Sequence, residues 1–127
     1  MDSDERIRIL VVDDHAILRR GLSALLMTCD DLLMVGEASN GWEAVKLCDE
    51  LEPDVVLMDL IMPVMDGITA TSIITQHHPN VRVLILTSSD SDRGSALRVG
   101  AHGYIHKTAL GSGREAQEDG RESSRGF

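Results

Sequence analysis

Short, nearly continuous apolar runs recur along the chain, and segments with helical spacing of apolar residues separate them. The strongest runs are rich in β-branched residues and cover 7–12, 55–58 and 81–86. Weaker runs cover 33–38 and 102–106. Strands buried on both faces of a parallel sheet have this composition, so each run predicts a strand.

The first two intervening segments have the pattern of amphipathic helices. An apolar stripe follows the first run and consists of Leu18, Leu22, Leu25 and Leu26, which predicts a helix with one buried face. Asn40 followed by Glu43 has the spacing of a capping pair, which predicts the start of the second helix. Its buried face would consist of Ala44, Val45, Cys48 and Leu51.

The last two intervening segments predict one regular and one weak helix. Asp66-Gly67 marks the start of the third helix, with Ile68, Thr71 and Ile74 on one side. The fourth lies between Ser91 and Val99 and contains Gly94-Ser95, which lowers helix propensity. Gly100 provides a left-handed cap at its end.

The alternation of strands and helices predicts an α/β fold with a doubly wound, five-stranded parallel sheet. Right-handed crossovers place helices on both faces. In the flavodoxin-like strand order 2-1-3-4-5, functional groups gather at the carboxyl ends of the strands. Residues 1–110 form this domain. Residues 111–127 are rich in glycine, serine and charge without an apolar stripe, so we expect a disordered or non-native tail and no regular fifth helix.

Composition narrows the possible partners and the location. The chain has 127 residues, which favours one domain, and it is 43% hydrophobic but only 2% aromatic, so the core is aliphatic. Its net charge of -9 argues against direct DNA binding by this chain. No apolar run approaches the ~20 residues of a membrane span. Cys29 and Cys48 lack metal or redox spacing, so we expect free, buried thiols and a cytoplasmic location.

Polar residues that carry chemistry stand at the ends of four predicted strands. Asp13 and Asp14 follow the first strand, Asp59 the third, Thr87 the fourth and Lys107 the fifth. The predicted strand order brings these ends to one edge of the sheet. Clustered carboxylates raise each other's pKa values, and a divalent cation relieves their repulsion. Oxygen ligands at a half-open site favour Mg²⁺ over zinc. A carboxylate that faces a cation and an ammonium can accept a phosphoryl group.

Each of these residues also has a purely structural interpretation. Asp13 and Asp14 suit the capping position of the first helix. Thr87 is an ordinary strand residue, and Lys107 an ordinary surface lysine. Their common position at strand ends favours the functional interpretation. The five histidines show no ligand spacing, and we interpret Met62 and Met65 as core residues because methionine fills irregular gaps.

Five ordered motifs make the chain similar to the receiver domain of bacterial response regulators. They are Val-Val-Asp-Asp-His at 11–15, Val-Leu-Met-Asp at 56–59, Met-Pro-Val-Met-Asp-Gly at 62–67, Leu-Thr-Ser at 86–88 and Gly-Tyr-Ile-His-Lys at 103–107. The segments Arg-Arg-Gly-Leu at 19–22 and Gly-Glu-Ala-Ser-Asn-Gly at 36–41 resemble the NarL/FixJ branch in particular. The resemblance extends from about Arg6 to Lys107.

The resemblance implies a role for each site residue. Asp59 would accept a phosphoryl group from a sensor histidine kinase, with Lys107 and Thr87 contacting that group. Asp14 and Asp59 would bind Mg²⁺ directly together with the backbone carbonyl of Ile61, and Asp13 would bind it through water. The protein would be a phosphoacceptor with limited self-dephosphorylation rather than an enzyme in its own right.

The resemblance also implies a conformational switch formed by Thr87 and Tyr104, but the chain departs from the family pattern near it. We expect a shortened fourth helix, no regular fifth helix, and none of the C-terminal helix-turn-helix domain that is usual in this branch. Apolar surface left uncovered favours a homodimer through exposed or exchanged elements. Ile61 and Ser89 would flank the path of water to the acyl phosphate, so we expect Ile61 to affect the rate of phosphate loss.

Two other functions fit the sequence less well than a phosphorylated switch. A haloacid-dehalogenase-type phosphatase requires a second aspartate two places after the first, where this chain has Ile61. A flavodoxin-like cofactor binder requires a Gly/Ser/Thr loop where this chain has Asp13-Asp14. A receiver-like protein-interaction module that no longer switches stays open, because the altered helices belong to the surface that signals output.

Overall fold

The computed structural model describes residues 5–88 and 93–108. Strands and helices alternate in the order β1 Ile7–Val12, α1 Ala16–Met27, β2 Leu32–Ala38, α2 Gly41–Leu51, β3 Val55–Asp59, α3 Gly67–His77, β4 Arg82–Thr87, α4 Arg93–Arg98 and β5 Gly103–His106. The sheet has five strands in the order β2-β1-β3-β4-β5, and all neighbouring strands are parallel. The predicted fold class is therefore confirmed.

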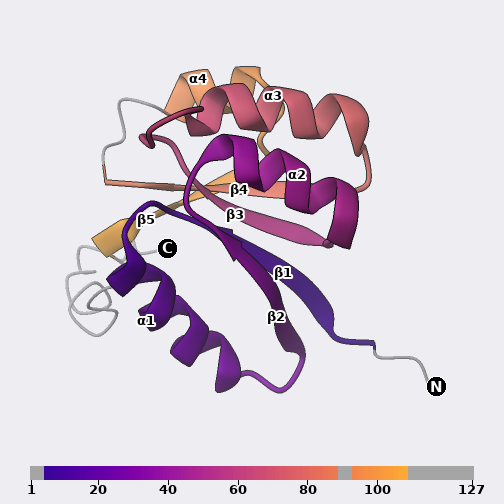
Figure 1. Cartoon of the computed structure of the whole chain (residues 1–127), viewed down its shortest axis with the longest axis vertical. Helices are drawn as coiled ribbons and strands as arrows, with labels where there is room; N and C mark the ends of the chain where they lie inside the picture. The colour runs from indigo at the N-terminus through magenta and orange to yellow at the C-terminus, as the bar shows by residue number, and fades with distance from the viewer. Residues whose placement is uncertain (1–4, 89–92, 109–127) are drawn as a thin grey trace.

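Helices cover both faces of this sheet (Figure 1). Helices α2, α3 and α4 lie on one face and α1 lies on the other. The described part of the fourth helix is short and covers Arg93–Arg98. Ser89, the domain boundary at residue 110, the predicted tail and the predicted absence of a fifth helix lie outside the described residues.

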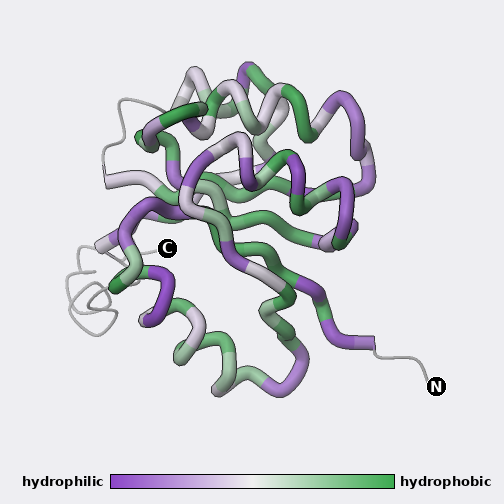
Figure 2. Tube along the Cα trace, in the orientation of Figure 1, coloured by the Kyte–Doolittle hydropathy of each residue, from purple (hydrophilic) through white to green (hydrophobic). Residues whose placement is uncertain are grey.

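The central strands are mostly apolar, with Arg8 and Arg82 near the starts of β1 and β4, as expected for strands covered on both faces (Figure 2). Strand β1 pairs with β3 in the register Leu10↔Val56, which aligns their carboxyl ends. The predicted carboxyl ends of two strands need a small correction. Asp59 and Thr87 are the last residues of β3 and β4 rather than the residues that follow them, so the sheet itself fixes their backbones.

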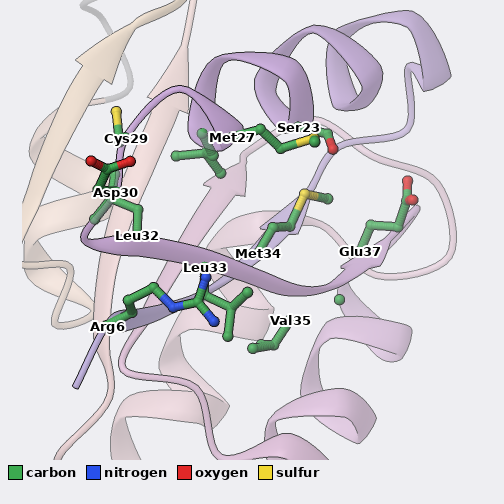
Figure 3. A pocket seen from close by; sticks show the side chains of 12 residues that line it. Arg6, Ser23, Met27, Cys29, Asp30, Leu32, Leu33, Met34, Val35 and Glu37 are labelled. Carbon is green, nitrogen blue, oxygen red and sulfur yellow. The ribbon is translucent and has the colours of Figure 1, made fainter. Parts of the chain in front are cut away.

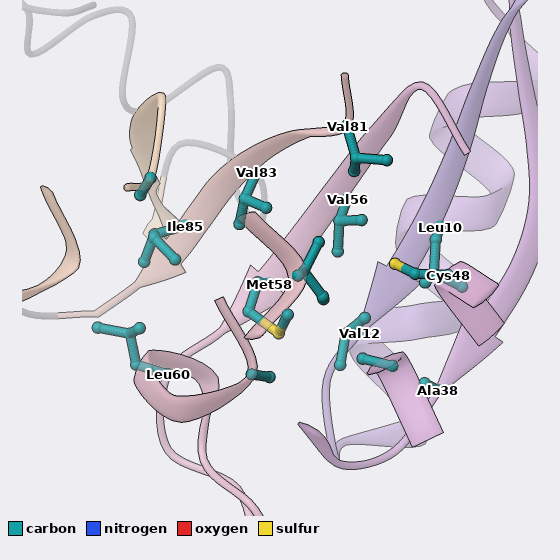
Figure 4. Close-up of a cluster of buried hydrophobic side chains, with 14 of the residues drawn as sticks. Leu10, Val12, Ala38, Cys48, Val56, Met58, Leu60, Val81, Val83 and Ile85 are labelled. Carbon is teal, nitrogen blue, oxygen red and sulfur yellow. The ribbon is translucent and has the colours of Figure 1, made fainter. Parts of the chain in front are cut away.

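Two apolar clusters fill the space between sheet and helices. The cluster under α2, α3 and α4 is shown in Figure 4 and includes Leu10, Val12, Cys48, Val56, Met58, Met62, Ile74, Val83 and Ile85. The cluster under α1 is smaller and consists of Ile9, Val11, Leu22, Leu26, Leu57 and Leu86. Met62 is a core residue, as predicted. Burial raises the pKa of the Cys48 thiol to about 12, whereas Cys29, predicted to be buried, is only partly so.

The prediction for the first helix was wrong at one position. Leu22 and Leu26 are buried and Leu18 packs against them, but Leu25 is 47% exposed. At about 100° per residue, Leu25 lies at the edge of the apolar stripe, beside Leu18 and away from the buried Leu26. Ile17 and Met27 on the same helix are also largely exposed. Helix α1 therefore keeps apolar surface that no described residue covers.

The predicted helix starts are confirmed by their hydrogen bonds. Asn40 Oδ1 accepts a hydrogen bond from the Glu43 backbone N–H at 2.8 Å, and the Ser39 backbone N–H donates to Glu43 Oε1 at 2.8 Å. Accepting from Ser39 holds the pKa of Glu43 below its ordinary value. Asp66 Oδ1 accepts from the Thr69 N–H at 2.8 Å. Gly100 has a φ of 102° and ends α4 in the left-handed region, as predicted.

A groove runs along the edge strand β2 and the C-terminal end of α1 (Figure 3). Its lining includes Met27, Cys29, Leu33 and Met34. None of the strand-end aspartates lines it. Among the helices of the described residues, none is long and apolar enough to cross a membrane.

Candidate functional site

Side chains from the ends of three strands meet at the carboxyl edge of the sheet. Lys107 Nζ lies 3.0 Å from Asp13 Oδ2 and 3.0 Å from Asp59 Oδ1. One ligand atom from each of Asp13, Asp14, His15 and Asp59 lies within 4.8 Å of the others. The structure thus brings together the acidic residues and the lysine that the sequence placed at separate strand ends.

The buried carboxylates of this site are incompletely paired. Asp13 is fully buried and Asp59 is 4% exposed. Oδ1 of Asp59 pairs with Lys107, but its buried Oδ2 has no hydrogen-bond partner among the described residues. An unpaired carboxylate oxygen that is removed from water is costly, so native proteins rarely keep one without a ligand that uses it.

Burial and charge shift the pKa values of the two central groups. Burial raises the pKa of Asp59; Lys107 opposes this rise but does not cancel it, and the charges of Asp13 and Asp14 add to it. Burial alone would lower the pKa of Lys107, but its hydrogen bonds to Asp13 and Asp59 raise it overall. The surroundings therefore favour the protonated form of Lys107 and disfavour the negative charge of Asp59.

The loop after β1 fixes Asp13 from several sides. Asp13 Oδ1 accepts from the His15 backbone N–H at 2.8 Å, and Arg19 donates to the Asp13 carbonyl at 2.6 Å. Arg19 also pairs with Glu37 at 2.6 Å. His15, not an aspartate, occupies the N-cap of α1 and makes no side-chain cap bond. The helix-capping interpretation of Asp13 and Asp14 is therefore wrong.

His15 belongs to the acidic cluster, although the sequence did not predict it as a site residue. Its Nδ1 lies 2.9 Å from Asp13 Oδ1 and 3.2 Å from Asp14 Oδ1. The hydrogen bond to Asp13 and the charge of Asp14 raise the pKa of His15. Ligand spacing among histidines was the wrong signal, because the donors next to His15 are aspartates. The available signal was the direct succession Asp13-Asp14-His15 at the end of a buried strand.

The loop between β3 and α3 is held close to Asp59 by a glycine. The Gly67 N–H donates to the Leu60 carbonyl at 2.8 Å, and a Cβ at Gly67 would overlap the Asp59 carbonyl oxygen. Only glycine allows the helix start to approach the strand end this closely. Val64 in the same loop has a φ of 69°, which is strained for a β-branched residue. Ile61 is 76% exposed.

The predicted switch residues lie on the neighbouring strands. Thr87 is the last residue of β4 and is buried. Tyr104 lies on β5 opposite Ile85 and packs, partly buried, against the apolar cluster under α2 and α3. Both residues therefore lie on the two strands beyond β3, on the β5 side of Asp59.

Comparison with known proteins matches this fold and site to one family. The response regulator receiver domain matches residues 9–112. The response regulator protein VraR of Staphylococcus aureus is 43% identical over 122 residues, which are 94% of this chain and 57% of VraR. The chain therefore spans little more than half the length of this relative. It belongs to the response regulator receiver domain family.

Solved structures support the same family and its NarL branch. The receiver domain of the response regulator NarL from Mycobacterium tuberculosis is 34% identical with a TM-score of 0.77, covering 81% of this chain and 85% of that one. A chain of the CheX-CheY-BeF3-Mg²⁺ complex from Borrelia burgdorferi is 29% identical to this chain with a TM-score of 0.72. The match covers 79% of this chain and 77% of that one. The prediction of a NarL/FixJ-like receiver domain is confirmed.

Proposed function

We propose that Asp59 is the phosphoryl acceptor of this receiver and that a sensor histidine kinase is its donor. The observation that carries the proposal is the buried Oδ2 of Asp59, which has no hydrogen-bond partner among the described residues while Oδ1 is held by Lys107. An anchored carboxylate with one uncommitted oxygen is arranged to act as a nucleophile.

The donor set fits a Mg²⁺ ion. Asp14 and Asp59 would hold it directly with the carbonyl of Ile61, and Asp13 would hold it through water. Carboxylate and carbonyl oxygens are the ligands that Mg²⁺ prefers, and the related CheY complex from Borrelia burgdorferi contains Mg²⁺. When bound, the ion supplies positive charge that neutralises the oxygens of the transferring phosphoryl group.

The chain's own residues account for the transfer step. Oδ2 of Asp59 attacks phosphorus, a P–O bond forms, and the P–N bond of the donor phosphohistidine breaks. The donor imidazole leaves with the bonding electron pair and takes up a proton. Lys107 lies 3.0 Å from Asp59 Oδ1, so its ammonium is placed to bind a phosphoryl oxygen. Thr87 would donate its hydroxyl to another, and Tyr104 would follow it inward as the second half of the switch.

Phosphorylation by a small donor tests the acceptor. The full chain is incubated with acetyl phosphate with and without Mg²⁺, and its intact mass is measured. Wild type and Asp31→Asn, an exposed control, should gain the mass of one phosphoryl group only with Mg²⁺. Asp59→Asn should gain none. Adduct formation without any change in the tyrosine and histidine NMR signals would favour an interaction module that does not switch.

Ile61 would also affect the lifetime of the acyl phosphate on Asp59. Its exposed apolar side chain offers no hydrogen bond to a water molecule beside Asp59. Ile61→Asn should speed phosphate loss, because an amide can hold the attacking water. An unchanged rate of loss in a time course of intact mass would remove this role.

Self-association and a cytoplasmic location stay predictions. The exposed side chains of Ile17 and Met27 on α1 are the apolar surface through which a second copy would bind. Light scattering over a wide concentration range tests this, because Ile17→Glu should weaken any dimer. A compact monomer throughout that range would contradict self-association.

A further inference from the structure

Three donor atoms at the mouth of the acidic pocket lie at the spacing of neighbouring metal ligands. His15 Nδ1 is 2.9 Å from Asp13 Oδ1 and 3.2 Å from Asp14 Oδ1. Adjacent ligands on an octahedral ion with bonds of roughly 2.1 Å are separated by about 3.0 Å. The contact with Asp13 is a hydrogen bond in this structure. The contact with Asp14, a proposed direct ligand, places the imidazole nitrogen where a neighbouring ligand of the same ion would stand.

The local fold does not require the imidazole to be there. Asp13 Oδ1 already accepts the His15 backbone N–H at 2.8 Å, so Asp13 would keep a partner without the ring. The ring makes no side-chain cap bond for α1, and the His15 side chain is 68% exposed. A hydrogen bond to Asp13 and the charge of Asp14 hold the ring at the mouth of the pocket, where it serves no helix-capping role.

A second observation points to a ligand at the same place. Asp59, which is 4% exposed, directs an Oδ2 atom without a hydrogen-bond partner among the described residues into the pocket. One ligand atom of Asp59 lies within 4.8 Å of one from each of Asp13, Asp14 and His15. A cation bound between them would use the uncommitted oxygen and the imidazole together.

We propose that His15 is a nitrogen ligand of this cation site and gives the pocket a preference for transition-metal ions such as Co²⁺ and Ni²⁺ over Mg²⁺. The inference rests on the proposed function only in that both use one cation pocket. Mg²⁺ takes oxygen ligands and gains little from a nitrogen, whereas imidazole suits late transition metals. The aspartates bind either class of ion, and His15 decides how strongly the two classes differ.

Calorimetric titration of the full chain with Co²⁺ alone and with Mg²⁺ alone tests the proposal. His15→Gln keeps an N–H that can donate to Asp13 but removes the imidazole. His78→Gln is a matched control, because His78 also touches a carboxylate, Asp49, at 2.6 Å but lies outside the acidic cluster. Asp59→Asn tests the pocket itself.

His15→Gln should weaken Co²⁺ binding on the order of tenfold, the scale on which loss of a group that supports a metal site acts, and leave Mg²⁺ binding nearly unchanged. His78→Gln should change neither affinity. Substoichiometric Co²⁺ should also shift the ring proton NMR signals of His15 in wild type, since the ion is paramagnetic.

The opposite results separate the two proposals. Unchanged Co²⁺ affinity in His15→Gln, or an equal loss for both ions, overturns the ligand role of His15 while the cation pocket stands. If wild type binds neither ion, or if Asp59→Asn leaves both affinities unchanged, the pocket of the proposed function fails and the inference fails with it.

Discussion

The acidic pocket borders the apolar cluster under α2, α3 and α4, called the layer below, but burial has opposite effects on stability in the two regions. In the apolar layer, Val56, Ile74 and Val83 are fully buried side chains without polar atoms. In the pocket, Asp13 and Asp59 are equally buried but carry charge, with one carboxylate oxygen unpaired among the described residues. Buried apolar area stabilises the fold, whereas buried charge opposes it.

The comparison shows that the buried groups that oppose folding are the carboxylates of the pocket. The raised pKa of Asp59 means that its surroundings disfavour its negative charge. A bound cation offsets this charge, which couples cation binding to the stability of the strand ends. Substitutions should therefore destabilise the protein in the layer and stabilise it in the pocket.

Ile74→Ala should have the largest effect and should confirm the stabilising role of the layer. Ile74 is fully buried on α3, and the cavity left by its truncation should reduce the free energy of unfolding by about 3 kcal/mol. Urea denaturation monitored by circular dichroism measures this loss. Ile73→Ala, at a partly exposed position of the same helix, should lose much less; equal losses would contradict the assignment.

Gly67→Ala should have the second largest effect on stability, because Gly67 lies where the apolar layer borders the acidic pocket. The added Cβ would overlap the Asp59 carbonyl oxygen, and the resulting backbone shift should destabilise the protein by about 2 kcal/mol. It should also weaken Mg²⁺ binding by displacing Asp59. Gly21→Ala on α1 is the control, since a Cβ there meets nothing within 4 Å and should slightly stabilise the helix.

Asp59→Asn should have the opposite sign. Without cations at neutral pH, the amide avoids burying a charge beside two other carboxylates and should modestly stabilise the protein. Because the folded-state pKa of Asp59 is raised, wild type is favoured at low pH and loses stability as pH rises through that pKa. The difference between the two proteins should therefore be small below about pH 4 and full above the raised pKa.

Thermal denaturation across this pH window checks the Asp59→Asn prediction, with Asp31→Asn as the exposed control. Added Mg²⁺ should raise the melting temperature of wild type but not of Asp59→Asn. A destabilised Asp59→Asn at neutral pH would show that the ion pair with Lys107 outweighs the cost of burial.

Val64→Gly should have the smallest effect. Glycine adopts the φ of 69° found at this position without strain, but it also makes the unfolded chain more flexible, so the net gain should be about 0.5 kcal/mol. Urea denaturation measures it. A clear loss of stability would mean that the side chain of Val64, rather than its backbone, matters to the loop.

The sequence predicted the parts of this molecule that depend on periodicity. The three strongest strands are mostly apolar. Their alternation with helices predicted a doubly wound parallel sheet, so the meeting of Asp13, Asp59 and Lys107 could be expected. Asn40 and Asp66 were identified as helix starts because side-chain capping requires particular residue types at fixed spacing.

The features that the sequence missed depend on contacts between elements. The exposure of Leu25 follows from the limited surface against which α1 packs. The φ of Val64 is imposed by the closure of a short loop over Gly67. His15 joined the cluster through its approach to Asp13 and Asp14, a spatial relation that histidine spacing along the chain does not encode.

Chemical location of the phosphoryl group tests the role of Asp59 most directly. Protein treated with acetyl phosphate and Mg²⁺ is reduced with borohydride, which converts an acyl phosphate into a stable alcohol, and the peptides are sequenced by mass spectrometry. The modified residue should be Asp59 alone, and only in samples that contained Mg²⁺. Modification of Asp13 or Asp14 instead, or of no residue at all, would contradict the phosphoacceptor role.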